Sequence, residues 1–111
     1  MKAEKQRKYF RLTYPASYRP TLLLDAFDYE IEDISEYGLK VKTNNDPAFM
    51  VDDTVMAIIA FPGGREFDLS GQVVRMDQGY VGLQLETPLP NSIIKSEALY
   101  LMTNFVASNQ A

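Results

Sequence analysis

The sequence contains no cysteine and no histidine. The first absence excludes disulfides and thiol nucleophiles, and the two together exclude the common zinc-binding sets. Histidine is also the side chain that most often serves as a general base in enzymes. We therefore expect a protein that binds rather than catalyses, with no metal or other cofactor.

Long hydrophobic runs are missing as well. The longest, "VMAIIAF" at Val55–Phe61, has seven residues, whereas a membrane-spanning helix needs about 20. The charged amino terminus does not lead into the apolar core of a signal peptide. These features predict a cytoplasmic protein without membrane insertion. The 111 residues suffice for one domain, and we expect no second domain beside it.

Basic residues are scarce outside the first part of the chain. Residues 1–19 hold six basic and one acidic residue, a net charge of +5. The other 92 residues hold five basic and fourteen acidic residues, a net charge of −9, and the two parts give −4. Proteins that bind duplex DNA or RNA usually spread positive charge over a whole face. An acidic body with a short basic arm suits a small anionic ligand better.

Short β segments separated by turn residues fill residues 18–85. Turn residues lie at 44–47 (NNDP), 62–64 (PGG) and 77–79 (DQG), and the last two should close β-hairpins. Strands so close in sequence, without helical crossovers, form an antiparallel sheet, and six of them hide their edges by closing into a barrel. The six predicted strands are residues 18–25, 29–35, 38–43, 54–61, 66–76 and 80–85.

The carboxyl-terminal segment predicts a helix, capped by Asn91 or Ser92. Apolar residues recur there at helical spacing on one stripe. They are Ile94, Ala98, Leu101, Met102 and Phe105. Because "VMAIIAF" is apolar on both faces, we expect this helix to cover its outer side. The predicted fold class is all-β with a C-terminal helix: a flexible basic arm over residues 1–16, then a barrel and helix over residues 17–111.

The stretch "DISEYG", Asp33–Gly38, breaks the pattern of its strand. Tyr29 and Ile31 share one face, but the next apolar residue, Ile34, has the opposite phase, which predicts a bulge or strand end at Asp33. Asp33 and Ser35 are two residues apart and project to one side of an extended chain. Such residues also form ordinary turns, so both a local structural role and a ligand-binding role stay open.

The stretch "RKYFR", Arg7–Arg11, is the densest basic segment. Positions four apart share one face in a helix and also in a strand, so Arg7 and Arg11 point the same way in either conformation. This segment is either a solvated arm attached to the barrel or a pair of cations held ready for an anion.

The two stretches together form an R-x-x-x-R arm followed by D-x-S-x-x-G at a strand end of a small barrel. This combination resembles the PilZ domain, a bacterial receptor module for the second messenger cyclic di-GMP, and the resemblance runs from Arg7 through the terminal helix. It implies ligand contacts from five motif residues. They are Arg7, Arg11, Asp33, Ser35 and Gly38.

The chemistry of these residue types suits that ligand. An arginine matches both phosphate oxygens and the O6/N7 edge of guanine with paired donors, whereas lysine offers a point charge. The Asp33 carboxylate can accept N–H groups from the other guanine edge, Ser35 can add a hydroxyl contact, and Gly38 leaves room for a base near the backbone.

Three further residues are candidates. In "YVGLQL" Val81, Leu83 and Leu85 alternate inward, which leaves Gly82 and Gln84 on the outer face. Many family members have a similar Val-Gly-Leu strand beside the ligand. Gln6 occupies the position before the first arginine, which in the family influences whether one ligand or an intercalated pair binds.

The resemblance implies a receptor that signals through another protein of unknown identity or through its own homodimer. We expect the ligand to order the arm and so change the surface offered to a partner.

Three alternatives remain. The first is a ligand-free adaptor of the same fold. The second is a single-stranded nucleic acid binder that stacks bases on aromatic residues of the basic segment, which the acidic body disfavours. These aromatic residues are Tyr9, Phe10, Tyr14 and Tyr18. The third is an enzyme using Asp52 and Asp53, which adjacent strand positions would point to opposite faces.

Overall fold

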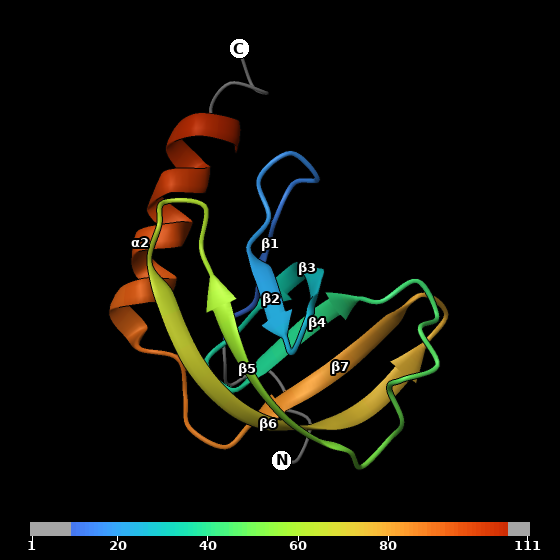
Figure 1. Cartoon of the computed structure of the whole chain (residues 1–111). Helices are drawn as coiled ribbons and strands as arrows, with labels where there is room; N and C mark the ends of the chain where they lie inside the picture. Colours follow the sequence, from blue (N-terminus) through green and yellow to red (C-terminus); the bar gives the residue numbers. More distant parts are fainter. Residues whose placement is uncertain (1–9, 107–111) are drawn as a thin grey trace, which may run out of the picture.

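The computed structural model describes residues 10–106, which form a small β-barrel with one helical segment at its end (Figure 1). All strand pairings are antiparallel. The strands are β1 (Leu12–Thr13), β2 (Thr21–Leu24), β3 (Phe27–Ile34), β4 (Gly38–Lys42), β5 (Thr54–Ala60), β6 (Glu66–Asp77) and β7 (Tyr80–Leu85). The helical segment consists of α2 (Asn91–Leu101) and a π-helical turn, η1 (Met102–Val106).

Six of the strands close into a barrel. The order β3-β2-β5-β6-β7-β4 returns to β3 because β3 pairs with β2 through its first half and with β4 through its second half. The predicted hairpins are present between β5 and β6 and between β6 and β7, where Gly64 and Gly79 adopt the positive φ that glycine tolerates. The predicted six-stranded antiparallel barrel is therefore confirmed, with β1 as one additional strand.

The barrel interior is filled by alternate strand residues. On β5, Val55, Ala57 and Ile59 are buried, as their spacing of two requires. Met56, on the outer face of the same strand, is 74% exposed. The prediction that a helix covers the outer side of "VMAIIAF" is thus wrong at Met56.

The helix instead closes one end of the barrel. Its apolar residues Ile93, Ile94 and Leu101 join the same core as the strand interiors. The Arg65 side chain, beside the β5–β6 turn, lies 3.4 Å from the Ser96 hydroxyl oxygen, and Figure 1 shows α2 alongside that turn. Among residues 10–106, no helix is long and apolar enough to cross a membrane.

Two details of the predicted helix are wrong. The helix begins after Pro90, and no side chain of Asn91 or Ser92 caps its first turn. Proline suits a helix start because the first N–H groups have no partner within the helix. Met102 is exposed rather than on the buried stripe, because each residue of an α-helix is turned by about 100° from the one before it, which carries Met102 beyond Leu101 and away from Ile93 and Glu97 on the buried face.

The amino-terminal part of the barrel begins earlier than predicted. Leu12 and Thr13 pair with Ile34 and Asp33 on β3, and Leu12 and Tyr14 are buried in the core. The boundary between arm and barrel therefore lies before Leu12 and not after residue 16. The flexible arm is predicted for residues 1–16; residues 12–14 belong to the barrel, and residues 1–9 lie outside the described residues.

Candidate ligand-binding groove

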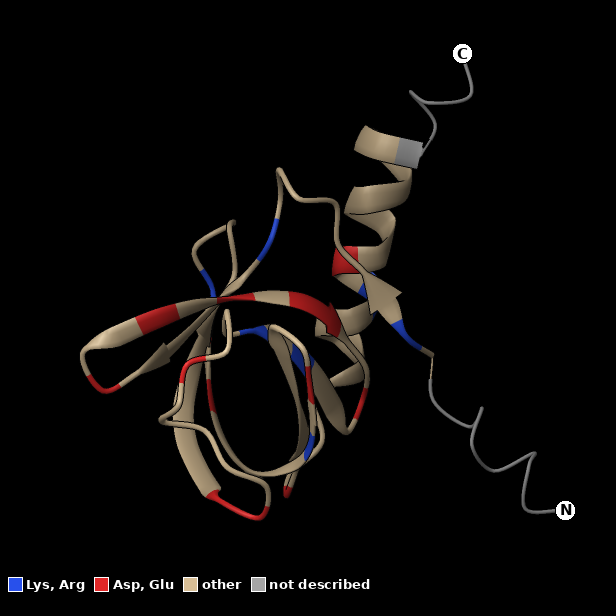
Figure 2. Ribbon diagram, turned by 90° about the vertical axis from the view of Figure 1, so that its right-hand side faces the viewer, with Lys and Arg blue, Asp and Glu red and all other residues tan. Residues whose placement is uncertain are grey.

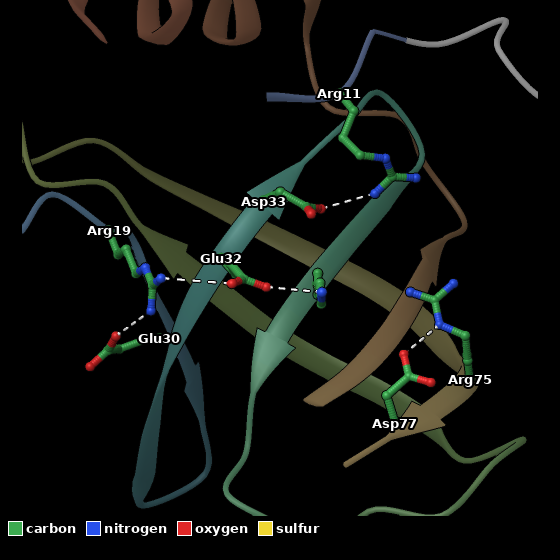
Figure 3. A network of polar contacts seen from close by, with 8 residues as sticks. Arg11, Arg19, Glu30, Glu32, Asp33, Arg75 and Asp77 are labelled. Carbon is green, nitrogen blue, oxygen red and sulfur yellow. Dashed lines mark hydrogen bonds and ion pairs between the residues drawn. The ribbon is translucent and has the colours of Figure 1, made fainter. Parts of the chain in front are cut away.

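Strand β1 places Arg11 beside Asp33. Leu12 and Tyr14 point into the core, so the alternate residues Arg11 and Thr13 face outward. Thr13 lies opposite Asp33 across the β1–β3 pairing, and Arg11 Nη1 donates to Asp33 Oδ1 at 2.9 Å (Figure 3). The Arg11 side chain is 57% exposed, whereas that of Asp33 is 10% exposed. A guanidinium has five N–H donors, so this ion pair does not exhaust the binding capacity of Arg11.

Strand β1 is also anchored to the helix at the barrel end. The buried Tyr14 hydroxyl donates to Glu97 Oε1 on α2 at 2.7 Å. Burial, and then this hydrogen bond, raise the pKa of Tyr14 far above its ordinary value. Arg65 Nη2 lies 3.8 Å from the other oxygen of Glu97. The segment that carries Arg11 is thus tied to α2 through a buried carboxylate.

A bulge in β3 turns Asp33 outward. The pairing of β3 with β4 shifts register between Ile31 and Asp33, so that Glu32 is the extra residue. Ile31 and Ile34 are both fully buried, and only an inserted residue allows inward positions three apart in a strand. The break in alternation at Asp33 therefore marks a bulge, as the sequence predicts.

Ser35 and Gly38 form the turn that follows. The Ser35 N–H donates to the Gly38 carbonyl at 2.9 Å, which closes the β3–β4 hairpin. A Cβ atom on Gly38 would lie 3.2 Å from Ser35 Oγ, a tight contact. Glycine at position 38 therefore leaves the space that the Ser35 hydroxyl occupies, which gives a local structural reason for the S-x-x-G spacing.

A groove of about 270 Å³ runs over the outer face of the sheet from this turn across β4, β7 and β6. The predicted inward alternation of β7 is present, since Val81, Leu83 and Leu85 are buried. Gly82 and Gln84 consequently face the groove, and Gly38 lies directly opposite Gln84. Residues lining the groove are Arg11, Ser35, Tyr37, Gly38, Leu39, Val74, Arg75, Gly82, Leu83 and Gln84.

Five of the predicted site residues thus line one groove: Arg11, Ser35, Gly38, Gly82 and Gln84. A sixth, Asp33, is joined to the groove through its ion pair with Arg11. Gln6 and Arg7 lie outside the described residues.

The main lining residue that sequence reasoning missed is Arg75 on β6. The register of β6 against β7 shifts between Val73 and Arg75, which makes Val74 the extra residue and directs Arg75 outward. The signal was present in the sequence, because the adjacent valines at 73 and 74 interrupt the alternation of the strand opposite Gly82.

The described part of the chain is acidic apart from a few basic positions (Figure 2). Within it, Arg11 and Arg75 share the groove. Another pocket, of about 320 Å³, lies beside β2 and β3, but its lining includes Asp28 and Glu30 together with Lys42. Two carboxylates there repel an anion, so the groove is the better site for a negatively charged ligand. No group of potential metal ligands is found among residues 10–106.

Comparison with protein families agrees with the sequence pattern and the fold. The family model described as the PilZ domain matches residues 5–100. The chain belongs to the PilZ domain family. The match includes all six barrel strands and most of α2, so the groove with its D-x-S-x-x-G turn lies within the PilZ domain. A search of curated proteins gives no significant match.

Proposed function

We propose that this PilZ domain is a non-enzymatic receptor for cyclic di-GMP. The observation that supports it best is the convergence of Arg11, Ser35 and Gly38 on one groove, with Asp33 ion-paired to Arg11 at its edge. Asp33 and Gly38 belong to β3 and β4, and Arg11 and Ser35 directly flank β1 and β3, so the barrel holds all four in fixed relative positions before any ligand arrives. Preorganisation of this kind lowers the entropic cost of binding.

Each residue has a role in the proposal. Arg11 binds a ligand phosphate or the O6/N7 edge of a guanine with paired donors. The Asp33 carboxylate orients Arg11 and accepts N–H groups of a guanine, and Ser35 adds a hydroxyl contact. Gly38 and Gly82 keep the floor of the groove open, and Gln84 offers an amide. Arg7 and Gln6, which precede the described residues, supply contacts from the arm.

We further propose that the ligand transmits its signal by ordering the arm against the barrel and so changing the surface seen by a protein partner. Only a difference in ligand affinity between the two states of the arm can drive such a change. Hydrogen exchange tests it: protection in residues 1–11 should increase with cyclic di-GMP. Identical protection with and without ligand contradicts the ordering mechanism, although not the binding itself.

Two of the four aromatic side chains that the nucleic acid alternative needs are already engaged within the fold. Tyr14 is buried, and the Tyr18 ring stacks on Tyr100 with ring centroids 4.8 Å apart. Neither ring is a free platform for a base. The enzyme alternative loses support similarly, because Asp53 Oδ2 accepts the Met50 N–H at 3.0 Å in a turn.

Isothermal titration of the protein with cyclic di-GMP tests the receptor function, with GTP as a control ligand. We expect micromolar or tighter binding, no binding of GTP, and a loss of affinity of about tenfold or more in Arg11→Ala, because each charge-assisted contact contributes about 1.5–3 kcal/mol. Lys95→Ala is the matched control: it removes one positive charge from α2, outside the groove, and should bind like the wild type.

If the wild type gives neither heat nor a shift of melting temperature with cyclic di-GMP, the receptor function is wrong. The ligand-free adaptor would then be the better description, because it needs the same fold without the ligand.

A further inference from the structure

Four residues form a row across the outer face of the sheet. Asp33 on β3 pairs with Lys40 on β4, Lys40 with Gly82 on β7, and Gly82 with Arg75 on β6. Residues directly opposite each other in antiparallel strands share a face. Arg75 is the last member of this row, and Arg11 is hydrogen-bonded to Asp33, the first member (Figure 3).

The Arg75 side chain leans over Gly82 towards the middle of the row. A Cβ atom on Gly82 would lie 3.4 Å from Arg75 Nη2 and 3.5 Å from Arg75 Cζ. Because Gly82 has no side chain, the Arg75 guanidinium can lie directly over the backbone of β7 at this position. Strands are about 4.8 Å apart, so three steps separate the backbones of Asp33 and Arg75 by roughly 14 Å. The lean of Arg75 shortens the gap between the two guanidinium groups.

Asp77 holds this orientation. Its Oδ2 accepts from Arg75 Nε at 2.9 Å, which leaves the two terminal nitrogens of the guanidinium for other partners. The Arg75 side chain is 55% exposed. The other cation of the row, Lys40, already lies 3.1 Å from Glu32 Oε1 and stacks over the Tyr80 ring. Arg75 is thus better placed than Lys40 to meet a ligand.

We propose that Arg75 is a third cationic residue of the ligand site and binds a phosphate of the dinucleotide from the side of the groove opposite Arg11. This inference rests on the proposed receptor function. It adds a residue outside both sequence motifs and gives Gly82 a definite purpose, which is to let the Arg75 side chain cross β7 into the groove.

Titration with cyclic di-GMP of the wild type, Arg75→Ala, Arg75→Lys and the control Lys95→Ala tests the inference. We expect Arg75→Ala to weaken binding by about tenfold or more, and Arg75→Lys to keep most of the affinity because lysine retains the charge for a phosphate. Raising the salt concentration should narrow the difference between wild type and Arg75→Ala, since ions screen an exposed charge pair. Melting temperatures should change little, because exposed ion pairs contribute about 0–1 kcal/mol.

Three outcomes overturn parts of the proposal separately. If Arg11→Ala loses binding but Arg75→Ala and Lys95→Ala both bind like the wild type, Arg75 is not a ligand residue and the receptor function stands. If Arg75→Lys binds as weakly as Arg75→Ala, the proposal that Arg75 binds a phosphate is wrong. If the wild type itself does not bind, the receptor function falls and this inference falls with it.

Discussion

The buried hydrogen bond between Tyr14 and Glu97 gives the sharpest test of how the barrel is held together. Replacing Tyr14 with phenylalanine removes a single oxygen atom and leaves the ring in the core. The hydroxyl donates to Glu97 Oε1 at 2.7 Å, and both residues are buried. After the change, the nearest cation to the carboxylate is Arg65 at 3.8 Å.

The expected loss follows from that geometry. A hydrogen bond to a charged group contributes about 1.5–3 kcal/mol, and a buried acceptor left without its donor keeps its desolvation cost. A domain of this size shifts its melting temperature by roughly 4 °C for each kcal/mol. We therefore expect Tyr14→Phe to lower the free energy of unfolding by about 1.5–3 kcal/mol and the melting temperature by roughly 6–12 °C.

Urea unfolding followed by circular dichroism measures this loss, and two variants sharpen it. Tyr29→Phe is the matched control, because its hydroxyl also donates over 2.7 Å, to the partly exposed Asp46, and should cost less. In a Glu97→Gln background the bond to Tyr14 is neutral, so Tyr14→Phe should cost about 1 kcal/mol less than in the wild type. Equal losses in both backgrounds, or a loss below about 0.5 kcal/mol in the wild type, would refute the reasoning.

Three further predictions concern single positions. Gly71→Ala should lower the melting temperature strongly, because its Cβ would lie 2.6 Å from a backbone oxygen of β7, whereas Gly63→Ala, with nothing within 4 Å, should change it little; equal effects in thermal unfolding would contradict this. Gly38→Ala should weaken cyclic di-GMP binding several-fold with little change in melting temperature, since it presses on the serine hydroxyl of the turn; unchanged affinity in the titration would count against that role. Burial and a hydrogen bond raise the pKa of Tyr29 from 10.0 to about 12. The neutral phenol is therefore favoured in the folded state, and the stability that it contributes is complete below pH 10 and is lost as the pH rises to about 12. Alkaline unfolding should show a shallower decline in Tyr29→Phe, and identical slopes would disprove the assignment.

Much of the fold could be predicted because the barrel strands carry their own signals. Alternation on β5 and β7, glycine-containing turns after β5 and β6, and the phase break at Asp33 are all local patterns. The same break located the bulge that turns Asp33 outward. For these strands and turns the prediction is correct, whereas the cap predicted at Asn91 or Ser92 is absent.

The errors arise where distant residues decide. Strand β1 has only two residues, too few for a periodic signal, and it forms because β3 offers a partner. The acidic residue Glu97 is buried because it accepts a hydrogen bond from Tyr14, which lies 83 positions earlier in the chain. The outer face of β5 stays uncovered at Met56 because the helix closes the end of the barrel instead. Arg75 was missed because its importance depends on the glycine across the strand pair.

The row from Asp33 to Arg75 has a consequence for how this domain can change. The hydrogen-bonded strands of the barrel fix the spacing of its members, which lie on the outer face, while the residues that fill the core lie on the inner face. Substitutions at Lys40, Gly82 or Arg75 can therefore alter ligand preference with little disturbance of the interior. Asp33, nearly enclosed between β1 and β4, lacks this freedom. If the proposed receptor function is correct, selection or design that changes ligand binding should therefore act first at the β6 end of the groove.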